Sequence, residues 1–271
     1  DFERNQIEAW GDSIESSSQA KLKNPLLRKE EHPDLPDAPA LLYVNFDPLL
    51  VRLLREVKYF LLLGFQVPGT ALEIYQHSEV FRRHMGNLDL IVNMYNNIQT
   101  TLLPVERPLL GNQLAKINKL LAQGIGGAKA KGKAPAKSLN WKSSNIELFI
   151  NESMSEVSEV NGTLAVLKSN LKRVEELLDS WSQQSLFTRN PNKSSSIEDF
   201  EQLQKLKRQQ RYSLIKDGGT EVHKLLKDSN RKLKVSQGLP DWKAYVDFIN
   251  NIVVSGLTRV VVVSLDAIEH Q

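Results

Sequence analysis

The segment GAKAKGKA, residues 127–134, has the glycine and lysine spacing of a phosphate-binding loop. Gly127, Gly132 and Lys133 occupy the three fixed positions of the pattern G-x-x-x-x-G-K-[ST]. In that pattern a final Ser or Thr hydroxyl ligates Mg²⁺, but this chain has Ala134 there. The loop should also follow a buried strand, whereas the preceding NQLAKINKLLAQ has its apolar residues at helical spacing. We therefore interpret this segment as a basic linker and expect no nucleotide or other cofactor.

Other residue types that could support catalysis or metal binding are poorly placed for it. His77 and His84 lie seven residues apart on a predicted helix, about 10 Å along its axis, whereas helical zinc pairs are four residues apart. A surface or structural role is the favoured interpretation of both. The chain has no cysteine, which excludes thiol nucleophiles, disulfides and cysteine zinc sites. We predict no catalytic centre and no metal site.

Basic residues are concentrated in two stretches that we predict as partner-binding surfaces. The first is the linker with Lys129, Lys131, Lys133 and Lys137, and the second is KLKRQQR with Lys205, Lys207, Arg208 and Arg211. A solvated helix face is the alternative interpretation of the second stretch. The net charge of +3, from 35 basic and 32 acidic residues, is too small to indicate nucleic-acid binding.

The elements that would position these residues are predicted to be helices almost throughout. Asp47 and Pro48 are typical of a helix start, and Gly64 of the end of that helix. Ser196 is predicted to cap a second helix, which the run 218–220 (Gly-Gly-Thr) is expected to break. The β-branched RVVVVSL near the end is predicted as helix, because no other segment reads as a strand that could pair with it.

The clearest pattern in the chain is a heptad seam between 157 and 181. Its apolar residues are spaced alternately three and four apart: Val157, Val160, Leu164, Leu167, Leu171, Val174, Leu178 and Trp181. One helix of a multi-helix bundle is the favoured interpretation, because apolar residues also flank the seam. A coiled coil between two chains is the alternative.

These patterns predict an all-α protein of successive helical bundles that form an elongated rod. We place a first bundle at 1–123, a Lys/Gly/Ala/Pro-rich linker at 124–140 and a second bundle at 141–271. No uninterrupted apolar run reaches the roughly 18 residues that span a bilayer, so no membrane contact is predicted. The chain begins at Asp1 and continues directly into helical spacing, as expected of a piece of a longer protein.

Four strings, in this order, resemble the N-terminal tail of axonemal dynein heavy chains. They are YVNFDPLLVRLLREVKYFLLLG, IVNMYNNIQTTLLPVERPLL, LNWKSSNIELFI and DWKAYVDFINNIVVSGLTRVVVVSLDAI. Each alone is only an amphipathic helix, but together they cover the chain from about Trp10 to its end. The chain departs from the family in the Lys-rich insert at 126–137, which is longer than the resemblance implies.

The resemblance implies a stem region of a ciliary motor, favouring an outer-arm over an inner-arm chain. The implied role is a non-catalytic scaffold, and the implied location is the cytoplasm and cytoskeleton, in the axoneme of the cilium or flagellum. The implied partners are WD-repeat intermediate chains, light chains, other dynein heavy chains and docking factors on the doublet microtubule, with no nucleic acid or membrane. The alternatives are a helical tethering or cytoskeletal crosslinking protein of another family, and a small ATPase built on GAKAKGKA.

Overall fold

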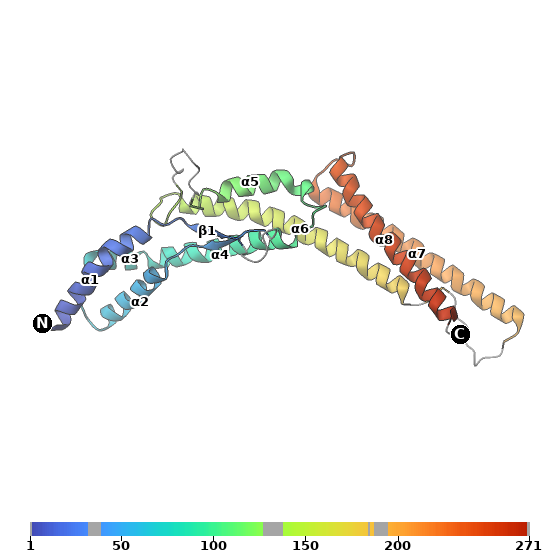
Figure 1. Cartoon of the computed structure of the whole chain (residues 1–271), viewed down its shortest axis with the longest axis horizontal. Helices are drawn as coiled ribbons and strands as arrows, with labels where there is room; N and C mark the ends of the chain where they lie inside the picture. The colour runs from blue at the N-terminus through green and yellow to red at the C-terminus, as the bar shows by residue number, and fades with distance from the viewer. Residues whose placement is uncertain (1, 32–38, 127–137, 184, 187–194, 270–271) are drawn as a thin grey trace. The chain divides into compact units, whose positions relative to one another are not determined.

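The computed structural model describes residues 2–31, 39–126, 138–183, 185–186 and 195–269. Helices dominate it (Figure 1). The elements are α1 (Phe2–Lys21), β1 (Leu27–Glu30), β2 (Leu41–Val44), α2 (Pro48–Leu62), α3 (Gly69–Gln76), α4 (Ser78–Thr101), the 3₁₀ helix η1 (Pro108–Leu110), α5 (Gly111–Leu121), α6 (Ile146–Ser182), α7 (Ile197–Leu233) and α8 (Pro240–Glu269). The all-α class is confirmed, and RVVVVSL is helical within α8 as predicted.

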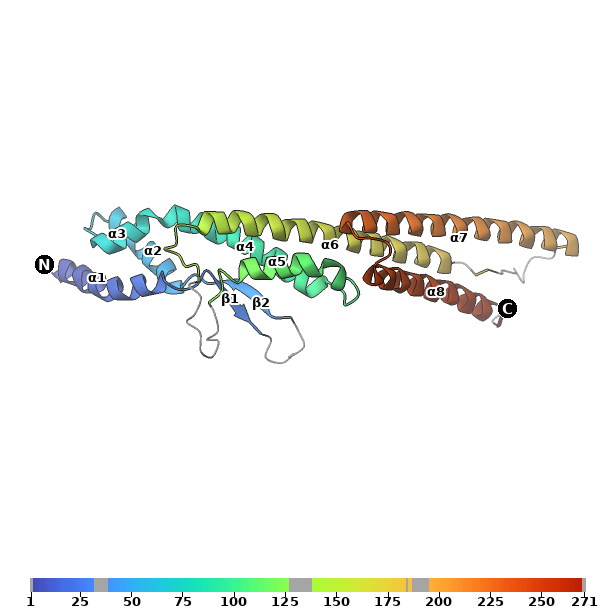
Figure 2. The ribbon, with the colours of Figure 1, turned by 90° about the horizontal axis from the view of Figure 1, so that it is seen from above.

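The expectation that no segment forms a paired strand is wrong, because β1 and β2 form an antiparallel hairpin. Leu27 pairs with Val44 and Glu30 with Leu41. The hairpin packs on α4 (Figure 1 and Figure 2). There the side-chain amide of Asn96 accepts a hydrogen bond from the Leu42 N–H and donates one to the Leu42 carbonyl, both at 2.9 Å. This amide occupies the hydrogen-bonding groups that an edge strand would otherwise leave open. Tertiary packing therefore supports two strands of four residues each, LRKE and LLYV, which are too short to be recognised in the sequence.

The α2 helix begins at the residues where the sequence predicts a helix start. The Asp47 carboxylate accepts a hydrogen bond from the Leu49 N–H at 2.9 Å, and Pro48 is the first helical residue. Beyond the other end of α2, Gly64 has a φ of 77°, which glycine adopts without strain. Both predicted helix limits are confirmed.

Two compact units can be distinguished in the chain. Unit 1 comprises Asp1–Leu102 with Asn112–Asn161, and unit 2 comprises Leu103–Gly111 with Gly162–Gln271. The division falls within α6. The predicted linker, 124–140, includes residues 127–137, which lie outside the described residues. The limits of the linker and of the two bundles therefore stay a prediction.

In unit 1 the helices α4, α5 and the first part of α6 lie side by side. Polar pairs join their surfaces: Asn97 to Asn161 at 2.9 Å, Lys116 to Glu156 at 2.6 Å and Tyr95 to Asn118 at 2.9 Å. Trp141, just before α6, is buried and donates its indole N–H to the Asn45 carbonyl at 2.8 Å. Its ring meets Phe46 edge to face, with centroids 4.8 Å apart. The YVNFD and LNW strings, nearly one hundred residues apart, therefore meet in one core.

Unit 2 is built from η1, the second part of α6, and the antiparallel pair α7 and α8. The Ser196 hydroxyl caps α7 by accepting from the Asp199 N–H at 3.1 Å, as predicted. The expected break at 218–220 is wrong, because α7 continues through both glycines to Leu233. A Cβ on Gly218 would lie 2.5 Å from the Trp181 ring, so the glycine lets α6 and α7 approach closely. Gly218 therefore serves packing between helices rather than a turn.

The heptad seam of α6 is buried inside this single chain. Seven of its eight side chains are buried, and Leu171 is half-buried. Gly256 of α8 lies directly against Leu178, and Gly218 of α7 against Trp181. The bundle interpretation therefore describes the seam, whose partners are helices of the same chain.

We expect Gly218→Ala to destabilise the protein although alanine is the better helix former. The new methyl group would overlap the buried Trp181 ring, and overpacking of this kind costs about 1–3 kcal/mol. The neighbouring Gly219 has no atom within 4 Å of the position that a methyl group would take, so Gly219→Ala should be neutral or stabilising by up to about 1 kcal/mol. Urea denaturation followed by circular dichroism compares the two variants. Equal stability of both would contradict the role given to Gly218.

Candidate functional site

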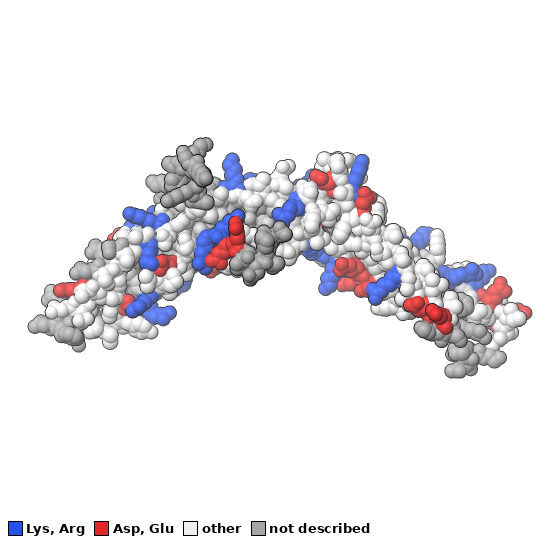
Figure 3. Space-filling view, viewed as in Figure 1, with Lys and Arg blue, Asp and Glu red and all other residues white. Residues whose placement is uncertain are grey.

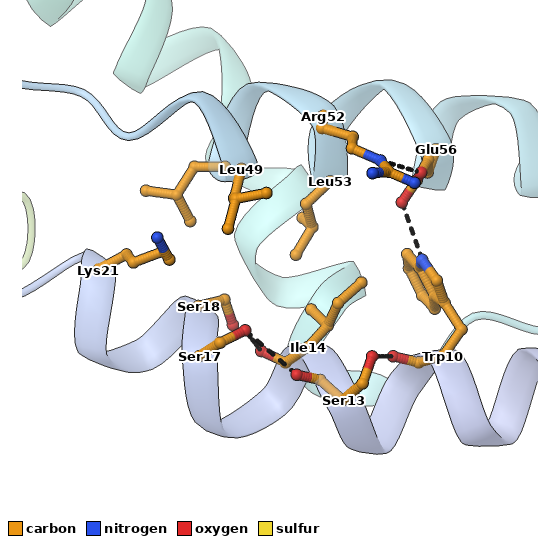
Figure 4. A pocket seen from close by; sticks show the side chains of 11 residues that line it. Trp10, Ser13, Ile14, Ser17, Ser18, Lys21, Leu49, Arg52, Leu53 and Glu56 are labelled. Atoms are coloured by element: carbon orange, nitrogen blue, oxygen red, sulfur yellow. Dashed lines mark hydrogen bonds and ion pairs between the residues drawn. The ribbon is translucent and has the colours of Figure 1, made fainter.

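A groove of about 240 Å³ lies between α1 and α2 in unit 1 (Figure 4). The residues that line it come from both helices: Trp10, Ser13, Ile14, Ser17, Ser18, Lys21, Leu49, Leu50, Arg52, Leu53 and Glu56. Figure 4 shows the serines along α1 facing the leucines of α2. Nothing in the sequence indicates this groove, because its two walls come from separate helices that each read as ordinary amphipathic segments.

The charged groups of the groove are already paired with one another. Glu56 accepts hydrogen bonds from the Trp10 indole N–H at 2.8 Å and from Arg52 Nε at 2.7 Å. Lys21 Nζ lies 2.5 Å from Asp47 Oδ2. Burial raises the pKa of Asp47, but hydrogen bonds from Lys21 and from the Leu49 N–H outweigh it, so the net pKa is lowered. These pairs connect α1 to α2, and the groove holds no acid–base pair poised for proton transfer.

The predicted partner-binding residues fall into three groups. Lys129, Lys131, Lys133 and Lys137 lie outside the described residues, as does all of GAKAKGKA. Lys205 and Arg208 are exposed on α7 beside Tyr212. Lys207 and Arg211 are half-buried on another face of the same helix. The structure therefore brings together only Lys205 and Arg208 of the second stretch as one exposed basic surface.

The two histidines considered as metal ligands have different surroundings. His77 is exposed, and its Nδ1 lies 2.9 Å from the Glu73 carbonyl oxygen. His84 is buried, and neither of its ring nitrogens has a hydrogen-bond partner among the described residues. Its Nε2 lies 3.8 Å from Glu147, which in turn pairs with Arg83 at 2.6 Å. Across the described part of the chain, no cluster of three or more potential metal ligands is found.

Burial lowers the pKa of the His84 imidazole below its ordinary value. The nearby Glu147 carboxylate acts in the opposite direction, and Arg83 adds to the lowering. Neutral His84 is therefore the form that the folded state favours. The sequence suggested a structural role for this residue, and its burial in α4 agrees with that interpretation.

A buried carboxylate lies in the core of unit 2. Glu106 is fully buried, and one of its oxygens accepts from Lys168 Nζ at 2.6 Å and from the Leu103 N–H at 2.8 Å. Tyr245 of α8 is buried nearby, and burial together with the Glu106 charge raises its pKa to about 12. The sequence offered no sign of this cluster, because Glu106 lies in a short segment between two prolines.

The remaining charged surface shows no dominant sign on the face seen in Figure 3, where basic and acidic side chains alternate over each unit. Among the described residues, α8 is the helix that is long and apolar enough, by length and composition alone, to cross a membrane. The fold and its surfaces together define an all-α protein of long packed helices, several of whose charged side chains form ion pairs between neighbouring helices.

Comparison with known proteins identifies the family of these helices. Residues 1–149 match the family described as dynein heavy chain, N-terminal region 1. The chain is 34% identical over 285 residues to the dynein beta chain of the flagellar outer arm of Chlamydomonas reinhardtii, covering 94% of this chain and 6% of that protein. It is 33% identical over 257 residues to the ciliary dynein beta chain of Heliocidaris crassispina, covering 94% and 5%.

The chain therefore belongs to the dynein heavy chain family and corresponds to its N-terminal region. It spans only about 6% of the length of the outer-arm relative. A dynein-1-alpha heavy chain of the flagellar inner arm I1 complex of Chlamydomonas reinhardtii is also similar, at 25% identity over 201 residues, covering 74% of this chain and 4% of that protein. The resemblance to axonemal dynein heavy chains, and with it an axonemal location in cilia or flagella, is confirmed.

We expect the stability of the protein to fall as the pH drops below about 6.5, in part through His84. The unfolded chain takes up a proton near the ordinary histidine pKa of about 6.5, whereas folded His84 resists protonation until lower pH. Its contribution to stability is thus complete above the unfolded pKa and is lost as the pH falls through that value. Urea denaturation of His84→Gln should show a weaker loss between pH 7 and 5 than the native chain.

The exposed His77 provides the control for this measurement. Its substitution by Gln should leave the pH dependence of the unfolding free energy unchanged. An unaltered pH dependence in His84→Gln would exclude the buried histidine as its source.

Replacing Lys168 with methionine should destabilise unit 2 by on the order of 3 kcal/mol. The change leaves the Glu106 carboxylate buried without its cation, and breaking a buried pair costs more than the pair itself contributes. Adding Glu106→Gln to the same variant removes the unpaired charge and should restore part of the loss. A double variant no more stable than Lys168→Met in chemical denaturation would argue against an energetic link between these two residues.

Proposed function

We propose that this chain is a non-catalytic stem region of a ciliary dynein heavy chain that serves as a scaffold. In this role it would hold heavy chains together and carry intermediate and light chains, so that the motor is anchored to the doublet microtubule of the axoneme. The observation that supports this proposal best is the match of residues 1–149 to the N-terminal region of dynein heavy chains. The higher identity to the outer-arm beta chain than to the inner-arm chain favours an outer-arm assignment.

The architecture of the described residues fits a scaffold. Long helices expose large apolar side chains, among them Leu62 and Leu63 at the end of α2, each 70% exposed. Exposed apolar residues that recur along helices are the usual material of protein–protein interfaces. Two bundles separated at 124–140 would offer surfaces on both sides of the basic linker, and that division is part of the proposal.

Family membership removes the alternative of a tethering or crosslinking protein of another family. The small-ATPase alternative makes a separate, simple prediction. A nucleotide that binds the folded chain must raise its melting temperature by mass action. On our proposal, millimolar Mg-ATP leaves the melting temperature unchanged in differential scanning fluorimetry.

Affinity purification from ciliary extract tests the scaffold role directly. With this chain as bait, mass spectrometry should recover WD-repeat intermediate chains, light chains and other dynein heavy chains in preference to a bait of unrelated helical protein. Recovery of actin-linked or membrane-tethering proteins without any motor subunit would overturn the proposal.

Reversing the charge of the exposed basic pair on α7 should weaken the binding of an acidic partner. We expect Lys205→Glu with Arg208→Glu to reduce recovery of at least one dynein subunit about tenfold, equivalent to about 1.4 kcal/mol. The matched control is Lys224→Glu with Lys227→Glu, two exposed residues of the same helix at the same spacing. Equal recovery with both double variants would remove this surface from the proposed interface.

A further inference from the structure

A buried histidine with two unpaired ring nitrogens lies on α4, close to the start of α6 in unit 1. The His84 side chain is 8% exposed, and neither Nδ1 nor Nε2 has a hydrogen-bond partner among the described residues. A neutral imidazole carries one donor and one acceptor, so burial leaves both of them unsatisfied. An aliphatic side chain would fill the same space without that cost, so packing alone does not account for a histidine at this position.

One carboxylate oxygen lies close to both this histidine and an arginine. Glu147 Oε1, in the first turn of α6, lies 2.6 Å from Nη2 of Arg83 and 3.8 Å from Nε2 of His84. The first distance is that of a short charge-assisted hydrogen bond, whereas the second is too long for a hydrogen bond. While the histidine is neutral, Glu147 is therefore held by Arg83 and not by His84.

The two candidate partners of Glu147 differ in how well water can replace the carboxylate. The side chains of Arg83 and Glu147 are 61% and 64% exposed. An exposed ion pair contributes little to stability, because water solvates both partners when they separate. A protonated His84 would instead be a buried charge, which is costly unless a counter-charge pairs with it. Protonation therefore makes Glu147 more valuable as a partner of His84 than as a partner of Arg83.

The charged groups around His84 are few. Burial lowers the pKa of His84, the Glu147 carboxylate of α6 raises it, and the Arg83 guanidinium of α4 lowers it. Lys142, in the segment before α6, donates to Gln19 of α1. The residues one helical turn from His84 on α4 and from Glu147 on α6 are not titratable: Val80, Phe81, Asn87, Leu88, Ile150 and Asn151.

We propose that His84 and Glu147 form a proton-operated contact between α4 and α6. When His84 is neutral, Glu147 pairs with Arg83 at the surface. When His84 takes up a proton from solvent, the Glu147 carboxylate leaves Arg83 and accepts a hydrogen bond from Nε2 of the buried imidazolium, while Arg83 is solvated by water. The N–H bond on the imidazole is the one covalent bond that forms. This contact lies within unit 1 and does not depend on the proposed scaffold function.

The contact responds to acid. Because the pKa of folded His84 lies below the ordinary histidine value of about 6.5, the neutral arrangement holds at pH 7 and above. Acidification below that value populates the protonated arrangement. Removing the Glu147 charge should then lower the pKa of His84 further, whereas removing the Arg83 charge should raise it.

Nuclear magnetic resonance of the 271-residue chain with ¹⁵N-labelled histidine tests this contact directly. A pH titration gives the pKa of His84 in the native chain, in Glu147→Gln and in Arg83→Gln. Below that pKa, the Nε2 proton of His84 should exchange with water about tenfold faster in Glu147→Gln than in the native chain, because its hydrogen bond is lost. Unchanged exchange would overturn the proposal, since burial alone would then explain the protection.

Urea denaturation measures the same contact as stability. Glu147→Gln should lower the folding equilibrium constant only slightly at about one pH unit above the His84 pKa, and about tenfold more at about one unit below it. The matched control is Glu79→Gln, which removes the carboxylate from another exposed pair of α4, with Arg82 at 2.7 Å. Its small effect should be the same at both pH values.

A third background assigns the effect to the histidine. In His84→Gln, the effect of Glu147→Gln should no longer depend on pH, because no buried imidazolium forms. A pH dependence that persists there would assign the contact to another group and overturn the proposal. Equal effects of Glu147→Gln and Glu79→Gln at both pH values in the native background would overturn it as well.

Discussion

Burial of one apolar seam along α6 is the constraint on which most of this structure depends. The α6 helix has 37 residues, and packing of its apolar stripe against other helices, rather than intrinsic helix propensity, supplies most of its stability. The stripe runs from Val157 to Trp181 with almost every member buried. Each fully buried Leu or Val contributes roughly 1.5–3 kcal/mol relative to exposure, so the helices beside α6 are placed where they cover this seam. In unit 1 that cover includes α4 and α5, and in unit 2 it includes α7 and α8.

The close packing on the seam explains features that look unfavourable when taken singly. Gly218 and Gly256 lower the helix propensity of α7 and α8, yet each lets a large α6 side chain lie against the backbone of its neighbour. Glu106 is fully buried, and one of its carboxylate oxygens accepts hydrogen bonds from Lys168 and the Leu103 N–H, whereas the other has no hydrogen-bond partner among the described residues. In each case a local cost is offset by the contact it makes possible between helices.

The sequence predicted the helices well, because a period of 3.6 residues is a strong signal over long segments. Capping by Asp47 and Ser196 depends only on residues within four positions of the cap, and both caps were predicted correctly. The β1–β2 hairpin escaped prediction because it is stabilised by Asn96, more than fifty residues away. The helix break predicted at Gly218 and Gly219 was wrong, because the sequence alone does not distinguish a glycine that ends a helix from one that packs against a tryptophan ring of another helix. Burial of His84 and the half-buried placement of Lys207 and Arg211 likewise depend on how the helices fold together.

A stem region needs two kinds of helix surface, one that completes its own core and one that remains for partners. The α8 helix shows how one segment can provide both. Its inner face holds Trp242, Tyr245 and Ile249 in the core, while its outer face carries exposed aliphatic residues. A purely amphipathic helix would carry charge at the outer positions and be finished once packed. On α8 the exposed charges of Arg259 and Asp266 are interspersed with the exposed aliphatic side chains of Val254, Val261 and Leu265, so the described part of the chain leaves much of the apolar surface of this helix uncovered.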